Sequence, residues 1–376
     1  MRIGLDARYA SDHFPGIGRY IVGLARGLAE LETGHTLVLI AGPPSAGRRY
    51  DIEALGRLPG VELARLGAGP FGAAQHLALP ALARRLRLDL LHAPYFVRPV
   101  LGLPCPAVVT LYDLLGRHMP ATLSWRGRLL YRASLALSLR QAAAVVTISE
   151  SARADIARLY GLPAARLAVT PLAADARFSP RPAAEVAAAR ARHGLPERYA
   201  LYVGSNKPHK NLLALLRAWE LLGRGPGHGG RMLAIAGHED RKHPELRRYV
   251  GERGLSAGLR LLPNLPDADL PALYSGAEVF VFPSLYEGFG LPPLEAMACG
   301  VPVLCSAAAS LPEVVGDAAL TFDPASPEAL AEGLARLLGD AELRRELRAR
   351  GLRRAREFSW RRTALGTLRV YEAVTG

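Results

Sequence analysis

The sequence predicts an α/β protein of two domains, each built on a parallel β-sheet. Short runs rich in Val, Ile and Leu alternate with longer helical patterns, as in successive β–α–β units. These runs are almost wholly apolar, which is typical of strands buried on both faces of a parallel sheet. The length of 376 residues also exceeds what one ordinary hydrophobic core supports.

The candidate strands fall into two groups. The first group lies at 2–6, 36–41, 89–93, 107–113 and 144–149, with a helix expected near 18–31. Prolines and turn residues interrupt the pattern between 169 and 185. The second group lies at 199–204, 232–237, 259–264, 277–283, 301–305 and 318–322. We therefore expect Rossmann-like domains over 1–175 and 176–356, followed by a last amphipathic helix within 357–376.

Composition narrows the function classes. A net charge of +13 favours anionic partners such as nucleotide phosphates or anionic lipid. The sequence contains no basic stripe interleaved with aromatic residues, which is the pattern expected of a nucleic-acid binder. The three cysteines form no C-x-x-C pair, so we expect a reducing, cytoplasmic environment. We expect neither a signal peptide nor a spanning helix, because the chain starts on a strand pattern and its apolar stretches are short.

The segment "VFPSLYEGFGLPPLEAMACGVPVL" (281–304) predicts a strand, a glycine-containing loop and a helix. Glycines allow a close approach of the backbone, and a helix N-terminus offers N–H groups to a diphosphate. Glu287 and Glu295 are spaced E-x7-E. Carboxylates accept hydrogen bonds from hydroxyl groups, so this pair indicates a sugar and a ribose on either side of a diphosphate.

This segment closely resembles the signature of the retaining GT-B glycosyltransferases of group 1 (family four). The resemblance extends over nearly the whole chain through "GIGRY", "HAPYF", "VVTLYDL", "VTISESARADI", "YVGSNKPHKNL" and "LPEVVGDAALTFDP". It implies two Rossmann-like domains that face each other across a cleft, with the acceptor bound by the first and a nucleotide-sugar by the second. The last helix would cross back to the first domain. The resemblance implies a donor site with Glu287 at the sugar, Glu295 at the ribose, and the loop residues Gly288, Phe289, Gly290 and Leu291.

Lysine is rare in this chain, and two of its three lysines stand in "YVGSNKPHKNL". The resemblance places Lys210 against the donor phosphates, while Ser205 replaces an Arg of many members. A compact ammonium group can follow the charge that grows on a leaving diphosphate. Lys207 either shares this role or is simply solvated.

Further candidates follow strands of the first domain. Gly16 and Gly18 could let a helix N-terminus approach the donor phosphate or the acceptor, or could form only a tight turn. Tyr112 stands where many members of the family carry a His that contacts the transferred sugar. Tyrosine is neutral at pH 7, which suits a mechanism where a donor phosphate oxygen takes the acceptor proton. Asp113 and His92 are candidate acceptor ligands, and packing is an equal alternative for His92.

The remaining polar motifs do not predict a metal site. The resemblance places the nucleotide base against the backbone at Asn264 and Leu265. The D-x-D pattern of Asp267 and Asp269 favours a helix cap, with Asp267 at the cap and Asp269 in the first turn. We interpret "HEDRKH" (238–243) as a solvated loop. We therefore expect no metal and no cofactor besides the donor substrate.

The segment 123–141 combines four arginines with Trp125, Tyr131 and several leucines. Such a basic helix is a candidate for contact with an anionic membrane surface, and an ordinary packed helix is the alternative.

The prediction is a metal-independent retaining hexosyltransferase, with mannosyl as one candidate group and a sugar, lipid-linked sugar or polysaccharide as acceptor. A sugar-phosphate synthase or phosphorylase is an alternative. A catalytically silent nucleotide-sugar-binding protein is a further alternative. The presence of the two glutamates and Lys210 argues against it. We expect a cytoplasmic protein, with contact at the inner face of the plasma membrane as an option.

Overall fold

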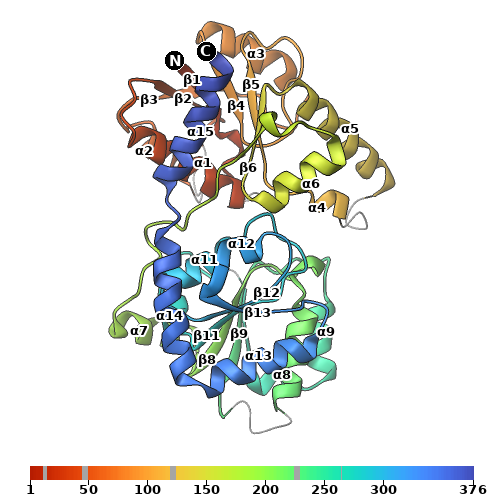
Figure 1. Ribbon diagram of the computed structural model, residues 1–376, viewed down its shortest axis with the longest axis vertical. Helices are drawn as coiled ribbons and strands as arrows, with labels where there is room; N and C mark the ends of the chain where they lie inside the picture. Colours follow the sequence, from red (N-terminus) through yellow and green to blue (C-terminus); the bar gives the residue numbers. More distant parts are fainter. Residues whose placement is uncertain (12–14, 45–49, 119–123, 224–228, 264) are drawn as a thin grey trace. The chain divides into compact units, whose positions relative to one another are not determined.

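The computed structural model describes residues 1–11, 15–44, 50–118, 124–223, 229–263 and 265–376. The chain forms two compact units. Unit 1 comprises Met1–Ala173 with Ser359–Gly376, and unit 2 comprises Ala174–Phe358; the junctions expected from the sequence were 175 and 357. Each unit is a parallel sheet covered by helices (Figure 1), which confirms the predicted α/β class.

Unit 1 contains a seven-stranded sheet in the order β3-β2-β1-β4-β5-β6-β7. All neighbouring strands pair in parallel. The strands are β1 (Arg2–Asp6), β2 (Thr36–Ala41), β3 (Val61–Arg65), β4 (Leu90–Ala93), β5 (Ala107–Leu111), β6 (Ala144–Thr147) and β7 (Leu167–Val169). The sequence analysis missed β3 and β7. Both are edge strands with partly exposed residues, so they lack the continuous apolar pattern of the central strands.

The helices of unit 1 include one from the end of the chain. They are α1 (Pro15–Ala29), α2 (Ile52–Leu55), α3 (Gln75–Arg85), α4 (Leu115–His118), α5 (Trp125–Gln141), α6 (Glu150–Tyr160) and α15 (Trp360–Thr375), with short 3₁₀ turns η1 (Ala7–Tyr9) and η3 (Ala164–Arg166). Helix α15 packs along α1 (Figure 1). The last helix therefore returns to the first unit, as expected.

Unit 2 contains a six-stranded parallel sheet in the order β10-β9-β8-β11-β12-β13. Its strands are β8 (Tyr199–Val203), β9 (Met232–Gly237), β10 (Leu259–Pro263), β11 (Val279–Phe282), β12 (Val303–Ser306) and β13 (Ala319–Phe322). Its helices are α7 (Ala183–His193), α8 (Leu212–Gly223), α9 (Glu245–Glu252), α10 (Leu270–Gly276), α11 (Leu291–Ala298), α12 (Leu311–Val315), α13 (Pro327–Gly339) and α14 (Ala341–Arg356), with 3₁₀ turns η4 (Pro208–Lys210), η5 (Leu255–Gly258) and η6 (Gly316–Ala318).

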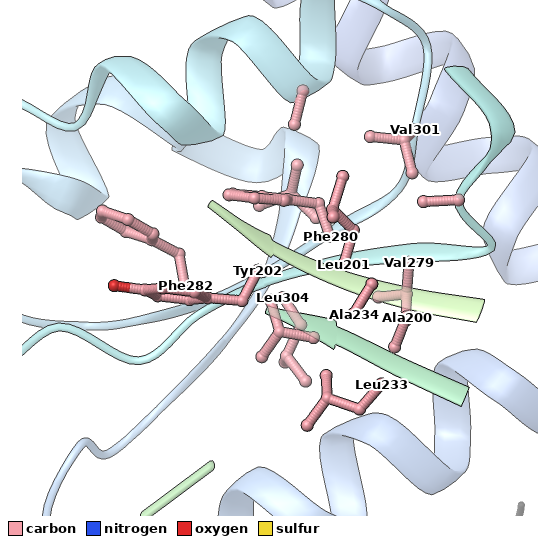
Figure 2. Close-up of a cluster of buried hydrophobic side chains, with 14 of the residues drawn as sticks. Ala200, Leu201, Tyr202, Leu233, Ala234, Val279, Phe280, Phe282, Val301 and Leu304 are labelled. Carbon is pink, nitrogen blue, oxygen red and sulfur yellow. The ribbon is translucent and has the colours of Figure 1, made fainter. Parts of the chain in front are cut away.

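The core of unit 2 lies along the central strands of its sheet. Figure 2 shows apolar side chains that project from β8, β9, β11 and β12 toward the covering helices. The rings of Tyr202 and Phe282 stack with centroids 6.2 Å apart, and Phe280 stacks on Phe282 at 5.9 Å. These large buried rings hold the ends of β8 and β11 in a fixed relation.

Two glycines of α1 allow the close packing of α15. A Cβ atom on Gly23 would lie 2.1 Å from the Trp360 ring, and one on Gly27 would lie 2.4 Å from the Trp360 carbonyl oxygen. The clash at Gly27 involves backbone, which cannot rotate away as a side chain can.

We expect Gly27→Ala to lower the free energy of unfolding by about 1–3 kcal/mol, because α15 must shift away from α1. Gly16→Ala in the same helix is the matched control, since a Cβ atom there meets nothing within 4 Å. The control should change stability by no more than about 1 kcal/mol. Thermal unfolding of both variants measures the difference, and equal midpoints would contradict the packing argument.

Candidate active site

Two loops of unit 2 meet where neighbouring strands end. Strands β8 and β11 pair in parallel, so their carboxyl ends lie at the same edge of the sheet. The loop after β8 leads into η4 and α8, and the loop after β11 leads into α11. The Leu285 N–H donates to the His209 carbonyl at 2.8 Å and joins the two loops directly.

Lys210 and Glu287 form an ion pair across these loops. The Lys210 Nζ donates to Glu287 Oε1 at 2.6 Å, and the two side chains are 17% and 14% exposed. The same ammonium group lies 5.4 Å from the centroid of the Phe282 ring, a cation–π distance. Two residues that the sequence analysis selected for separate reasons are therefore in direct contact.

The loop after β8 also carries Ser205, Lys207 and His209. Lys207 is exposed and has no ion pair of its own among the described contacts, which agrees with the solvated alternative. The side chain of Ser205 is partly exposed, and its carbonyl accepts a hydrogen bond from the Tyr202 hydroxyl at 2.9 Å. Burial, and after it the charge of Lys210, lower the pKa of His209 to about 4, so His209 is neutral at pH 7.

Ser310 fixes the loop that carries Glu287. Its hydroxyl lies 2.9 Å from the Glu287 carbonyl oxygen and 2.8 Å from that of Phe289. Gly290 has a φ of 114°, and a Cβ atom there would lie 2.6 Å from Leu311. A glycine is therefore required at the start of α11. Sequence reasoning missed Ser310, because it lies beyond the next strand along the chain.

Phe289 lies in the same loop, and its ring points into the core rather than toward solvent. Its side chain is 4% exposed and packs against Phe358, with ring centroids 5.8 Å apart. A donor contact through the Phe289 ring is therefore incompatible with this structure.

The N-terminus of α11 has fewer N–H donors than a typical helix. The helix begins at Leu291, and the next two residues are Pro292 and Pro293, which carry no N–H group. Backbone donors for a diphosphate at this helix end must therefore come from Leu291 and from the preceding loop of Gly288 to Gly290. Lys210, on the loop after the neighbouring strand β8, is the cation that pairs with Glu287 of this loop.

Glu295 lies deeper than Glu287. It is 2% exposed, and its Oε2 accepts a hydrogen bond from the Tyr274 hydroxyl at 3.3 Å. The E-x7-E spacing therefore places one carboxylate at the loop surface and one within α11. The ribose contact of Glu295 stays a prediction.

A pocket opens beside the Lys210 loop at the ends of β8, β9 and β10. A Cβ atom on Gly237 would lie 2.2 Å from the Gly204 carbonyl oxygen, so the two backbones approach closely. Asn206 donates to the carbonyls of Asp240 and His243 at 3.0 and 2.8 Å and thereby joins two loops. Neither Asn206 nor Gly237 was predicted from the sequence, although Asn206 is the second residue after one candidate strand and Gly237 ends another.

The base-binding prediction concerns the edge of this pocket. Pro263, the last residue of β10, lines the pocket. Leu265 is partly buried and packs against the core of unit 2, whereas Asn264 lies outside the described residues. The roles of both residues stay predictions.

The two glycines predicted near the donor differ in their surroundings. A Cβ atom on Gly18 would lie 2.2 Å from the Tyr50 ring, so this glycine is needed for packing. Gly16 is exposed in the first turn of α1, and a Cβ atom there meets nothing within 4 Å. Of the pair, Gly16 is thus the one whose surface is accessible to a ligand.

Tyr112 and Asp113 follow β5 in unit 1. The Tyr112 hydroxyl is buried and finds no hydrogen-bond partner among the described residues. Burial holds the pKa of Tyr112 well above its ordinary value, so the group is a neutral donor at physiological pH. The Oδ1 of Asp113 accepts a hydrogen bond from the Leu115 N–H at 2.9 Å and starts α4.

The expectation that His92 binds the acceptor is corrected by its burial. The side chain has 0% exposure. Its Nδ1 pairs with the Tyr371 hydroxyl of α15 at 2.5 Å, and its Nε2 pairs with Thr110 Oγ1 at 2.7 Å. Burial lowers the pKa of His92 to about 3. His92 therefore has the packing role that was the alternative, and its hydrogen bonds attach α15 to the sheet.

The two aspartates of the D-x-D pattern pair with cations. Asp269, rather than Asp267, stands at the cap position of α10, and its carboxylate makes no cap hydrogen bond. It contacts Arg192 and accepts from His193 Nε2 at 2.8 Å, while Asp267 lies 3.4 Å from Arg177. The prediction that Asp267 caps this helix and that Asp269 lies in its first turn is therefore wrong. Over the described ranges, no group of three or more His, Cys, Asp or Glu side chains could hold a metal ion.

Comparisons with known proteins agree with this geometry. The family model described as "Glycosyl transferases group 1" matches residues 186–354, and "Glycosyltransferase Family 4" matches 15–178. The O-antigen chain mannosyltransferase B of Escherichia coli is 38% identical, over 95% of this chain and 96% of its own length. The MMP alpha-(1->4)-mannosyltransferase of Mycolicibacterium hassiacum is 29% identical, over 99% of this chain and 98% of its own.

The fold also matches solved structures. The structure of Anabaena HepE in complex with UDP and glucose aligns with a TM-score of 0.77 at 19% identity, covering 99% of both chains. With matches to both halves of the sequence and to nearly the full length of a curated relative, the chain belongs to the group 1 glycosyltransferases and has the GT-B fold.

Proposed function

We propose that this glycosyltransferase moves a mannosyl group from a nucleotide-diphosphate sugar to a saccharide acceptor with retention of configuration. The observation that carries the proposal is the Lys210–Glu287 ion pair beside the start of α11, at the carboxyl edge of the unit 2 sheet. Relatives named as mannosyltransferases support the choice of sugar. Unit 2 binds the donor, and unit 1 binds the acceptor.

Lys210 stabilises the leaving diphosphate. In the ligand-free chain its charge is paired with Glu287 at 2.6 Å. When the donor binds, the ammonium turns toward the phosphates, and Glu287 accepts a hydrogen bond from a hydroxyl of the donor sugar. Charge grows on the diphosphate as its bond to the anomeric carbon breaks, so Lys210 contributes more in the transition state than in the ground state.

Retention follows if the acceptor attacks on the face that the diphosphate leaves. The bond from the anomeric carbon to the phosphate oxygen breaks, and the bond to the acceptor oxygen forms. The acceptor proton passes to an oxygen of the leaving phosphate. Tyr112 cannot serve as this base, because burial raises its pKa well above the ordinary value.

The proposed reaction uses no metal and no further cofactor. Lys210 and the backbone N–H groups near Leu291 neutralise the diphosphate in place of a divalent cation. The aspartates of the D-x-D pattern support this, because Arg192, His193 and Arg177 compensate their charges.

We further propose peripheral contact of unit 1 with an anionic membrane at the inner face of the plasma membrane. Helix α5 contains four arginines and no acidic residue. Several of its large apolar side chains face solvent: Trp125 (65% exposed), Leu129 (65%), Leu130 (69%) and Leu137 (45%). This combination matches the interface of an anionic bilayer. Within the part of the chain that the structure describes, no helix is long and apolar enough to cross a membrane.

A donor panel tests the proposed function. GDP-mannose, UDP-glucose, dTDP-glucose and ADP-glucose are each incubated with the full chain and methyl α-mannoside in EDTA, and products are identified by NMR. We expect transfer from GDP-mannose and an α-linked product. A β-linked product would rule out retention, and activity that returns only with Mn²⁺ or Mg²⁺ would rule out metal independence. Transfer only from another donor would overturn the mannosyl assignment.

Lys210→Ala should lower kcat by about 10²-fold or more, while the donor KM changes less, because the lost charge acts mainly in the transition state. Lys210→Arg should not fully restore kcat, because the planar guanidinium group cannot occupy the position of the ammonium. Lys207→Ala is the matched control, since this exposed lysine lies in the same loop. Steady-state kinetics compares the three variants, and full activity of Lys210→Ala would contradict the assigned role.

The combined change of Trp125, Leu129 and Leu130 to Ser should abolish sedimentation with anionic liposomes. Replacement of Arg126, Arg128 and Arg132 by Ser should weaken it, with the greatest effect at low salt. Leu101→Ser is the control, because Leu101 is 74% exposed outside α5. Unchanged sedimentation of the α5 variants, or none for the wild-type chain, would favour a soluble acceptor.

A further inference from the structure

Four strands of unit 1 are each followed by an aromatic residue at the carboxyl edge of the sheet. Tyr9 follows β1, Phe71 follows β3, Tyr95 follows β4 and Tyr112 follows β5. The strands β1, β4 and β5 are direct neighbours, and β3 lies two positions from β1. The mechanism above assigns no role to Tyr9, Phe71 or Tyr95.

Tyr9, Phe71 and Tyr95 form one cluster, here called the aromatic platform. The ring centroid of Tyr9 lies 5.6 Å from those of both Phe71 and Tyr95, and Phe71 lies 6.3 Å from Tyr95. Burial decreases across the platform. Tyr9 is 1% exposed, Tyr95 is partly buried, and Phe71 is 55% exposed. The platform therefore has a buried base and an apolar surface that faces solvent.

A buried ion pair holds the loop that carries Phe71. The guanidinium of Arg8 donates to both carboxylate oxygens of Asp6 at 2.8 and 2.6 Å, and both side chains are only 1% exposed. The same guanidinium donates to the Ala68 carbonyl at 2.8 Å, and Gln75 donates to the Pro70 carbonyl. Desolvating two charges is costly. The Asp6–Arg8 ion pair fixes the loop that carries the exposed side chain of Phe71.

Asp113 adds a hydrogen-bond acceptor beside the platform. It follows β5, next to the strand that Tyr95 follows. Burial, and after it the charge of the Asp113 carboxylate, raise the pKa of Tyr95 to about 12. Asp113 is partly exposed. An apolar ring face next to a carboxylate matches the chemistry of a sugar, which has C–H groups on its ring faces and hydroxyls at its edge.

We propose that the aromatic platform is an acceptor subsite, where Phe71 and Tyr95 pack against a sugar ring of the acceptor and Asp113 accepts a hydrogen bond from one of its hydroxyls. This inference rests on the proposed function, since it assumes a saccharide acceptor on unit 1. Because the loop is already fixed, little conformational entropy is lost when the sugar binds. The platform thus selects a saccharide over an acceptor that lacks a sugar ring near the attacking hydroxyl.

Saturation-transfer NMR on the full chain tests the subsite. The probes are the methyl glycosides of α-mannose, glucose, galactose and N-acetylglucosamine. At least one should bind the wild-type chain. Phe71→Ala should weaken its affinity about tenfold, as expected for the loss of one aromatic packing partner. Phe71→Trp should retain binding. Leu77→Ala is the matched control, because Leu77 is 82% exposed on the helix that follows the same loop.

Asp113→Asn provides a second variant that preserves folding, since the amide oxygen can still accept the Leu115 N–H bond. It should weaken binding of the same glycoside. Unchanged affinity in Phe71→Ala, an equal loss in Leu77→Ala, or no binding of any glycoside to the wild-type chain would overturn the subsite. Calorimetry of the wild-type chain with GDP-mannose separates the two ideas: donor binding without glycoside binding refutes only the subsite, and absence of both refutes the proposed function as well.

Discussion

Every candidate functional residue depends on the parallel pairing of the strands. In each sheet all strands run in one direction, so the loops after their carboxyl ends gather at one edge. Lys210 and Glu287 are far apart in sequence, yet β8 and β11 are neighbours and bring their loops into contact. The same constraint gathers Tyr9, Tyr95 and Asp113 in unit 1. Antiparallel strands would send half of these loops to the opposite edge.

At the carboxyl edge of the unit 2 sheet, the first turn of α11 has fewer backbone N–H donors than a typical helix. Two prolines in its first turn remove N–H donors that a phosphate would otherwise use. Lys210 on the neighbouring loop carries a positive charge, which the partly buried Glu287 pairs in this structure. The Glu287 carboxylate and the Phe282 ring both contact the ammonium and orient it in this structure.

Unit 1 shows how buried polar groups support a site without entering it. His92 pairs with Tyr371 and Thr110 and thereby attaches the last helix to the sheet. The Asp6–Arg8 ion pair fixes the loop that carries Phe71, because Arg8 also donates a hydrogen bond to the Ala68 carbonyl. In both cases an ionisable side chain satisfies hydrogen bonds of the scaffold. Burial distinguishes these groups from residues that can contact a ligand.

The sequence by itself determined the α/β class, the two-unit organisation and the family. Central strands are buried on both faces and must be continuously apolar, so they leave a clear pattern, whereas the edge strands β3 and β7 leave none. The E-x7-E segment was recognisable from its local spacing, and Lys210 was identified through the resemblance to the family. Only the tertiary structure decided that Lys210 pairs with Glu287, that the Phe289 ring is buried and that both nitrogens of His92 are occupied. Those outcomes depend on partners brought close by long-range strand and helix packing, and a linear pattern contains no record of such partners.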